Sequence, residues 1–314
     1  MEVNVNISIH FKKFKKHFIC LCALIIIGCN NEQTTKINIE NTIPIFQDDT
    51  TNKDLMNIGV AAMLSPENAL PVYREIVGYL GEKMNKKTKM IFTKDYATMN
   101  EYVKSKKVVV AFVCSGPYVQ AHDLWGMELV AAPSMYGETT YYSYIIVNKG
   151  SSYSSLEDLK GKKFAFTDPS SNTGKLVPTY ELSKNGTTPE EFFSEYIFTG
   201  SHDKSVEAVA DNLVDGAAVD NLVWEYMNHS DFSPTSKTRV IAKLGPFCIP
   251  PIVVNPSCND TIKKNIKKIL LNMHNDPDGK VILRKLYMDK FVDVQDDCYQ
   301  SIREMEEWIN ASGN

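Results

Sequence analysis

The sequence predicts an α/β fold made of two similar units, each a mixed sheet flanked by helices. Continuous apolar, β-branched runs such as residues 108–113 are typical of strands in a sheet that is covered on both faces. Stretches with apolar residues at helical spacing alternate with these runs, as they do in α/β proteins. A second strand–helix series begins near Tyr142, and residues 29–314 are enough for two such units. We therefore expect two lobes joined by a two-strand hinge.

The first unit has strand and helix signals in a clear order. A strand is predicted at residues 55–60, and Ser65 and Pro66 are typical of the cap and the first position of a helix. Apolar residues then recur at helical spacing over residues 70–84. The next expected elements are a strand at 89–92, a helix at 99–105 and a strand at 108–113.

The second unit repeats this alternation, and a C-terminal segment follows it. We expect strands at 143–148 and 164–166, a short helix and turn at 156–163, a helix at 174–184, and a further helix and strand within 206–219. Strands from Val240 and at 252–254 and helices at 261–274 and 302–309 end the chain. Because the first unit lacks finishing helices, we expect this last segment to pack on it, with hinge linkers near Tyr141 and Val240.

The N-terminus carries an export signal. Lysines at positions 12, 13, 15 and 16 precede an apolar run at 18–28, which is shorter than the ~20 residues of a membrane-spanning helix but suits a signal peptide. The run ends in Ile-Ile-Gly-Cys, which resembles a bacterial lipobox and predicts that Cys29 is diacylated. The alternative is an ordinary signal peptide with an incidental cysteine. The following polar stretch suits a tether, so we expect an extracytoplasmic, membrane-anchored lipoprotein.

These signals predict a division of the chain into five segments. They are a signal peptide at 1–28, a lipidated flexible tether at 29–52, the first part of lobe 1 at 53–141, lobe 2 at 142–240 and the second part of lobe 1 at 241–314.

Charge and cysteine content exclude several functional classes. The formal net charge of −4 includes the basic leader, so the exported part is more acidic, which argues against a nucleic-acid binder. Cysteines 114, 248, 258 and 298 show no C-x-x-C pair and no histidine at metal-ligand spacing, so we expect no metal site. An exported protein can pair some of them; Cys248 and Cys258 are nearest in sequence, but the pattern leaves the connectivity open.

Residues 164–174 are the stretch most suggestive of binding chemistry. A buried strand runs into Ser171, Asn172 and Thr173 just before a helix. The first N–H groups of a helix lack intrahelical partners and its dipole favours negative charge, so this pattern predicts an oxyanion site. The alternative is a helix cap that holds no ligand, but a cap needs only one such side chain.

Several motifs resemble the phosphate/phosphite/phosphonate-binding family of ABC-transporter solute-binding proteins. They lie at residues 154–162, 168–178, 201–203, 245–254 and 276–279. The similarity spans nearly the whole chain from about Asn57. It implies a type II periplasmic-binding-protein fold, a phosphorus oxyanion in the cleft between the lobes, an ABC permease and the membrane as partners, a monomer, and neither cofactor nor metal. The family loop usually reads Ser-Thr-Ser-Gly, and here it reads Ser171-Asn172-Thr173-Gly174, which keeps polar donors.

The resemblance also implies further ligand residues. It places His202 in the cleft as a donor to the oxyanion, and it places Tyr96 at the ligand. Ser115 follows the strand at 108–113, where lobe 1 would reach across the cleft. Asp220 follows a short apolar strand; a carboxylate beside an oxyanion is unfavourable unless a proton is shared, so it would select protonated ligands or accept from an amine. The alternative for Asp220 is a solvated helix cap.

The family comparison also bears on the ligand. Aminoalkylphosphonate binders of the family use an acidic residue where this chain has Pro250, which favours phosphite, phosphate or a small alkylphosphonate. Two other functions remain open. Tyr141-Tyr142 resembles the tyrosine pair of ferric-ion binders of the same fold, and the chain could act as a ligand sensor on a membrane partner. We expect no enzyme, because no nucleophile lies at a recognisable spacing from a base.

Overall fold

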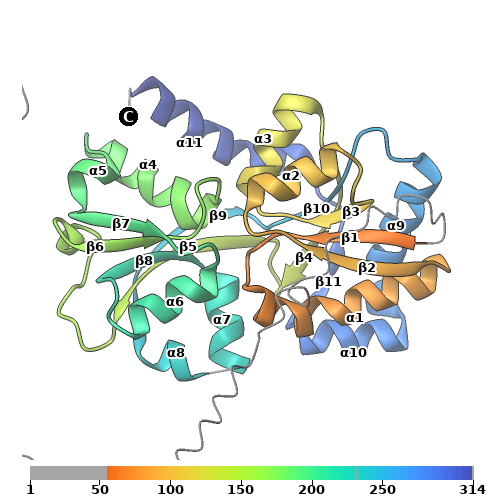
Figure 1. The fold of residues 1–314 in the computed structure, drawn as a ribbon, viewed down its shortest axis with the longest axis horizontal. Coiled ribbons are helices and arrows are strands. Elements are labelled where there is room, and N and C mark those ends of the chain that lie inside the picture. Colours follow the sequence, from red (N-terminus) through yellow and green to blue (C-terminus); the bar gives the residue numbers. More distant parts are fainter. Residues whose placement is uncertain (1–54, 231, 313–314) are drawn as a thin grey trace, which may run out of the picture. The chain divides into compact units, whose positions relative to one another are not determined.

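The computed structural model describes residues 55–230 and 232–312, which form two mixed sheets (Figure 1). The first sheet has the order β11-β4-β10-β3-β1-β2 and the second has the order β7-β6-β8-β5-β9. The first comprises β1 (Leu55–Val60), β2 (Lys87–Phe92), β3 (Val110–Phe112), β4 (Glu128–Met135), β10 (Ile252–Val254) and β11 (Met288–Val292). The second comprises β5 (Thr140–Asn148), β6 (Lys163–Phe166), β7 (Glu195–Phe198), β8 (Gly216–Asp220) and β9 (Thr238–Cys248).

Helices flank both sheets, which confirms the α/β prediction. Around the first sheet lie α1 (Pro66–Met84), α2 (Tyr96–Lys104), α3 (Ser115–Trp125), α9 (Asp260–Asn272) and α10 (Pro277–Lys285). Around the second lie α4 (Val177–Lys184), α5 (Pro189–Phe192), α6 (His202–Ala210), α7 (Asn221–Ser230) and α8 (Phe232–Ser236). Helix α11 (Gln300–Ala311) runs from α3 to α4 of the second lobe, where Trp308 packs on Tyr180 (Figure 1). The expectation that the whole C-terminal segment packs on the first lobe is therefore wrong for α11. Short helical turns are η2 (Glu157–Leu159), η3 (Asn172–Leu176), η4 (Met273–Asn275) and η5 (Asp296–Tyr299). Among the residues described, no helix is both long and apolar enough to span a membrane.

The central strands are buried as their composition predicts. Val110 and Ala111 of β3 are fully buried, and β8 is buried along its whole length. Phe164 and Phe166 of β6 pack with Phe193 in a hydrophobic cluster of the second lobe, where the ring centroids of Phe164 and Phe193 stack 4.3 Å apart. Burying a side chain of this size contributes about 1.5–3 kcal/mol. The strand predicted at 108–113 is shorter, because only three of its residues pair in the sheet.

Strands β5 and β9 form the long antiparallel pair that connects the two sheets (Figure 1). Their register runs from Thr140 opposite Cys248 to Asn148 opposite Thr238. The two expected linker positions, Tyr141 and Val240, both lie inside these paired strands. The segment boundaries at 141 and 240 stay a prediction. The predicted signal peptide, the tether and Cys29 lie outside the described residues.

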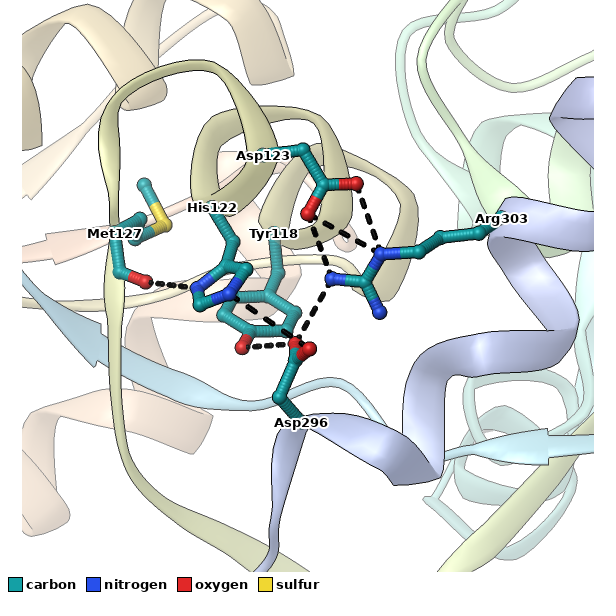
Figure 2. A network of polar contacts seen from close by, with 6 residues as sticks. All are labelled: Tyr118, His122, Asp123, Met127, Asp296 and Arg303. Atoms are coloured by element: carbon teal, nitrogen blue, oxygen red, sulfur yellow. Dashed lines mark hydrogen bonds and ion pairs between the residues drawn. The ribbon is translucent and has the colours of Figure 1, made fainter.

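The C-terminal segment is fastened to both sheets. Strand β11 pairs with β4 of the first sheet, and a disulfide joins Cys298 in η5 to Cys248 at the end of β9 in the second, while Cys114 and Cys258 are free. Figure 2 shows the polar network beside this disulfide, in which Arg303 of α11 contacts Asp123 and Asp296 at 2.8 and 3.0 Å. The network anchors α3, the helix whose first residue is Ser115.

The carboxylate of Asp296 also ties η5 to α3 through Tyr118. The hydroxyl of Tyr118 donates to Asp296 at 2.7 Å, and Nδ1 of His122 lies 2.8 Å from the carbonyl of Met127 (Figure 2). Hydrogen bonds to charged groups of this kind contribute more than neutral ones. The middle and last turn of α3 are therefore held by η5 and α11.

Candidate ligand-binding site

The loop after β6 forms the floor of the candidate site. Ser171 caps the following turn, because its hydroxyl accepts the N–H of Gly174 at 3.0 Å. The turn η3 has π-type bonding, with the N–H of Leu176 reaching Ser171 carbonyl, and α4 begins only at Val177. The α-helix expected from Gly174 thus begins three residues later, at Val177, after a π-type turn. One of the three predicted donors serves as the cap, which leaves Asn172 and Thr173 for another role.

Two glycines allow the loop to pack closely. A Cβ at Gly174 would lie 2.5 Å from Oγ1 of Thr167, and one at Gly116 would lie 2.6 Å from the carbonyl of Ser170. Both distances are shorter than the contacts that Cβ atoms make in proteins, so any side chain at these positions would displace the loop. The start of α3 therefore lies directly against the loop.

Four of the predicted residues each leave one buried polar atom without a partner. They are Oη of Tyr96, Oδ1 of Asn172, Oγ1 of Thr173 and Nε2 of His202. Seven such side-chain atoms occur in the described part of the chain, so these four form the majority. Buried polar atoms are nearly always hydrogen-bonded, because leaving one unpaired costs about 1–3 kcal/mol. Their concentration on the predicted residues indicates a place built for a polar ligand.

His202 presents a neutral N–H to this place. The backbone N–H of Asp220 donates to Nδ1 of His202 at 3.0 Å, so the ring proton belongs on Nε2, the unpaired atom. Burial lowers the pKa of His202 to about 3, which keeps the ring uncharged at neutral pH. The hydroxyl of Thr167 lies 3.0 Å from the same Nδ1 and links His202 to the loop.

Two tyrosines reach the candidate site, one from the start of α2 and one from β5. Tyr96 begins α2, and its N–H donates to Asp168 of the loop at 3.2 Å. Tyr141, on β5, accepts a hydrogen bond from the amide of Asn172 at 3.0 Å. Burial raises the pKa of both phenols well above the usual value, so both stay protonated and can donate. Rotating the Asn172 amide by half a turn would let Tyr141 donate to it and turn the NH₂ group toward the unpaired atoms.

Tyr141 is a candidate site residue that the sequence pointed to only as a hinge position and as one of a tyrosine pair. Its contact with Asn172 spans 31 positions in the chain, and no local pattern signals it. The alternating direction of side chains in β5 does separate it from Tyr142. Tyr141 is fully buried, whereas the ring of Tyr142 lies under the ammonium of Lys243, 3.7 Å from its centroid. The two phenols therefore have different surroundings, which lends no support to the ferric-ion interpretation.

Ser115 is at the site but its hydroxyl is engaged elsewhere. It donates to the carbonyl of Cys248 at 2.8 Å, at the end of β9. The residue is fully buried and opens α3, so its position beside the loop agrees with the expectation that lobe 1 reaches across here. A direct contact between Ser115 and a ligand stays a prediction.

Asp220 is buried at the end of β8 rather than solvated. Its Oδ1 accepts the N–H of Leu222 at 2.7 Å in the first turn of α7. Burial raises the pKa of Asp220 to about 7, although backbone hydrogen bonds from Leu222 and Val223 oppose the shift. Near neutral pH this carboxyl therefore holds a proton for part of the time.

A clasp made of Ser65, Asn68 and Asp203 joins the two lobes next to this site. Asp203 of α6 accepts hydrogen bonds from the N–H and hydroxyl of Ser65 at 2.9 and 2.5 Å and from the Asn68 amide at 2.7 Å. Burial raises the pKa of Asp203, but these bonds and one from Ser201 outweigh it and hold the pKa below its usual range. Ser65 was expected to cap α1; its hydroxyl instead reaches Asp203.

The site contains no buried cation. Among the described residues, no lysine or arginine is buried, and the ammonium of Lys175 lies over the ring of Phe166, 4.3 Å from its centroid. No group of three His, Cys, Asp or Glu side chains in the same part of the chain is placed to hold a metal ion. An open hollow of about 520 Å³ lies at the opposite end of α6, beside Asp211 and Lys237, and contains none of the unpaired atoms.

Comparisons with known proteins agree with this geometry. Residues 58–299 match the family model described as the periplasmic substrate-binding protein of phosphonate ABC transporters. The phosphonates-binding periplasmic protein of Escherichia coli is 27% identical over 237 residues, covering 74% of this chain and 70% of that protein. The probable phosphite-binding protein PhnD1 of Prochlorococcus marinus is 25% identical, covering 54% and 61% respectively.

Solved structures show the same fold. A binding protein of a Pseudomonas aeruginosa ABC phosphonate transporter superposes with a TM-score of 0.78 at 25% identity, covering 82% of this chain and 87% of that one. PhnD1 of Prochlorococcus marinus, solved with methylphosphonate, gives 0.74 at 20% identity, covering 82% and 98%. The expected two-lobed type II periplasmic-binding-protein fold is confirmed. The chain thus belongs to the phosphonate-binding family of periplasmic substrate-binding proteins of ABC transporters, a family of transport proteins rather than enzymes.

Proposed function

We propose that this protein holds a small phosphorus oxyanion, such as phosphite, phosphate or a small phosphonate, between its lobes and delivers it to the permease of an ABC importer. The observation that carries the proposal is the set of unpaired, buried atoms on Tyr96, Asn172, Thr173 and His202. Three of them belong to neutral groups that can donate: a phenol, a hydroxyl and an imidazole N–H. An oxyanion has enough acceptor oxygens to satisfy these three donors at once.

The chemistry of the site favours an oxyanion that carries a proton. No buried cation among the described residues balances the charge of a ligand, so neutral dipoles and the start of η3 must stabilise it. Asp220 would repel a fully ionised ligand but could share a proton with a hydrogen phosphonate or a hydrogen phosphate. Sulfate has no proton to share at neutral pH, so we expect it to be rejected.

A ligand screen tests the proposal. Phosphite, phosphate, methylphosphonate, 2-aminoethylphosphonate and sulfate are added in turn, and the melting temperature and the Kd are measured. A ligand at 100 times its Kd should stabilise the fold by about 2.7 kcal/mol. We expect at least one phosphorus oxyanion to do so and sulfate to have no effect. The absence of binding by all four phosphorus ligands would overturn the proposal.

We also propose that the protein is a monomeric lipoprotein held at the membrane through Cys29. The support is the lipobox-like end of the apolar run, which lies outside the described residues. One diacylated cysteine supplies the two chains that stable anchoring requires. Cys29→Ser should abolish fatty-acid labelling and release the protein from membranes, whereas Cys22→Ser, inside the same run, should not. Unchanged labelling of Cys29→Ser would contradict the anchor.

A further inference from the structure

We propose that a lysine face at the outer end of lobe 1 rests on the anionic phospholipid headgroups of the membrane, an inference that rests on the proposed anchor at Cys29. The lysine face consists of Lys87, Lys104, Lys106 and Lys107, and all four are exposed. None of them belongs to the candidate ligand-binding site. The face therefore gives the protein a second contact with the membrane besides its lipid.

Lysines are concentrated in one short segment of a protein that is acidic as a whole. Residues 83–107 contain eight lysines and only two acidic residues, Asp95 and Glu101, so the segment has a formal charge of +6. The whole chain has a formal charge of −4. A basic region of this kind attracts anionic surfaces even when the net charge of the protein is negative.

The fold gathers the lysine face around the start of β1. In the parallel pair of β1 and β2, Lys87 lies opposite the first residue of β1. On the other side of β1, the side chain of Asn57 donates to the carbonyl of Lys107 at 2.9 Å, just before β3. Lys104 ends α2, and Lys106 lies in the turn between α2 and β3. The amino-terminal ends of three neighbouring strands therefore bring the lysines to one edge of the first sheet.

The charge of the lysine face is not neutralised by neighbouring carboxylates. Within the part of the chain that the structure describes, none of the four lysines forms an ion pair, whereas Lys83 at the end of α1 pairs with Asp276 at 2.6 Å. Glu101 on α2 offsets part of the charge but leaves the face positive. The ammonium of Lys107 lies over the ring of Tyr102, 4.8 Å from its centroid. Amphipathic tyrosine rings of this kind suit the headgroup level of a membrane.

The place of the lysine face matches the place of the anchor. Strand β1 begins at Leu55, and only residues 30–54 separate it from Cys29 in the sequence. Figure 1 shows that β1 runs from the outer end of the first sheet toward the second sheet. The chain thus enters the described fold at the edge that carries the lysines. An anchor joined to this edge raises the local concentration of lipid around them.

Contact through this face leaves the ligand site accessible. The site residues follow the opposite ends of the same strands, since Tyr96 comes after β2 and Ser115 after β3. Each lysine near an anionic surface strengthens binding about fivefold, so the four together contribute about several hundredfold. The cleft then points away from the bilayer while the protein rests on it.

Chemical labelling of the anchored protein tests the contact. The exported, acylated protein is bound to vesicles of phosphatidylcholine alone or of equal parts phosphatidylcholine and phosphatidylglycerol, and its lysines are acetylated and quantified by mass spectrometry. We expect the four lysines of the face to react at least about fivefold more slowly on the anionic vesicles. Lys149 and Lys160, exposed on lobe 2, should react equally on both. Salt at about 1 M, where the Debye length is about 3 Å, should remove the difference.

Two fourfold variants test whether these lysines cause the contact. The first removes the charge of the face and combines Lys87→Gln, Lys104→Gln, Lys106→Gln and Lys107→Gln. The control removes the same charge from exposed lysines of lobe 2 and combines Lys149→Gln, Lys160→Gln, Lys184→Gln and Lys237→Gln. Energy transfer from tryptophan to dansyl-labelled lipid reports how close the protein lies to the bilayer. The unmodified protein and the control should show more transfer on anionic than on neutral vesicles, whereas the first variant should show equal transfer on both.

The outcomes separate the lysine face from the anchor. If labelling and energy transfer of the acylated protein do not depend on lipid charge, the face is overturned and the anchor stands. If Cys29 carries no acyl chain, the anchor fails, and the exported protein is sedimented with the same vesicles. Binding to the anionic vesicles alone then supports the face, and any other result overturns it. Protection of the lysines in native membranes but not on protein-free anionic vesicles would indicate an acidic protein partner and overturn the lipid contact.

Discussion

The clasp and the oxyanion site lie next to each other at the start of α6, yet their buried polar atoms are satisfied in opposite ways. In the clasp, the carboxylate of Asp203 accepts three hydrogen bonds from Ser65 and Asn68. In the site, the adjacent residue His202 leaves Nε2 unpaired within the described chain, as Tyr96 and Thr173 leave their hydroxyls. A satisfied buried charge holds two parts of a protein together, whereas unpaired donors lower stability until a ligand arrives. The comparison assigns closure of the lobes to the clasp and recognition of the ligand to the oxyanion site.

Asp203 and Asp220 make the same contrast within one residue type. Burial raises the pKa of both carboxyls. Donors from Ser201, Ser65 and Asn68 overcome this for Asp203, whose pKa falls below the usual range, whereas Asp220 ends at about 7. More donors reach Asp203 than Asp220, which favours the charged form of Asp203.

The largest expected effect comes from removing a donor from the site. Thr173→Ala and His202→Ala should each weaken binding of the best phosphorus ligand about ten- to a hundredfold, because a bond to a charged, buried oxyanion is worth about 1.5–3 kcal/mol. The melting temperature of ligand-free Thr173→Ala should stay close to that of the unmodified protein, since its hydroxyl has no partner in the described chain. Calorimetry and thermal melting measure the two effects.

Thr179→Ala is the matched control for the threonine. Its hydroxyl donates to the carbonyl of Lys175 within the helical segment and does not face the site atoms. Its affinity should remain unchanged. If both site variants bind as tightly as the unmodified protein, these residues serve as caps and packing, and the comparison between the two regions collapses.

The second effect concerns the clasp. Asp203→Asn keeps the shape of the side chain but removes the charge that accepts from Ser65 and Asn68. We expect about a tenfold loss of affinity, because closure is weakened while the oxyanion donors remain. Small-angle scattering should show a smaller ligand-induced decrease in radius of gyration than in the unmodified protein. Asp211→Asn, at the exposed end of the same helix, serves as the control. An equal radius of gyration with and without ligand in the unmodified protein would contradict closure.

The smallest effect is the pH dependence caused by Asp220. Its folded pKa of about 7 exceeds the ~3.9 of an unfolded aspartate. The native state therefore binds the proton more tightly, so the stability contributed by this group is fully present below pH 4 and lost as pH rises through 7. Between pH 6 and 7 the free energy of unfolding should fall by about 1 kcal/mol. Asp220→Asn should remove this decrease in denaturant titrations, and a slope that survives the substitution would refute the assignment.

Local patterns were enough to predict the parts of the molecule that depend on near neighbours in sequence. The Ser65–Pro66 helix start, strands such as β1, β6 and β10 and the polar loop at 171–173 all follow from residues within a few positions of each other. Resemblance to a known family added Tyr96 and His202, which spacing alone did not distinguish from packing residues. Several elements were not predicted, namely helices α3, α5, α7, α8 and α10 and strands β4, β7 and β11.

What only the tertiary structure decided is which polar atoms have partners. Asp203 meets Ser65 across 138 positions, Cys248 pairs with Cys298 rather than Cys258, and Tyr141 meets Asn172 through the fold. The sequence by itself determined the residue types at the site, since donors and helix starts are local properties. Whether His202 stays unpaired or Asp220 becomes buried depends on groups brought from distant segments, because hydrogen bonding and desolvation are set by three-dimensional neighbours.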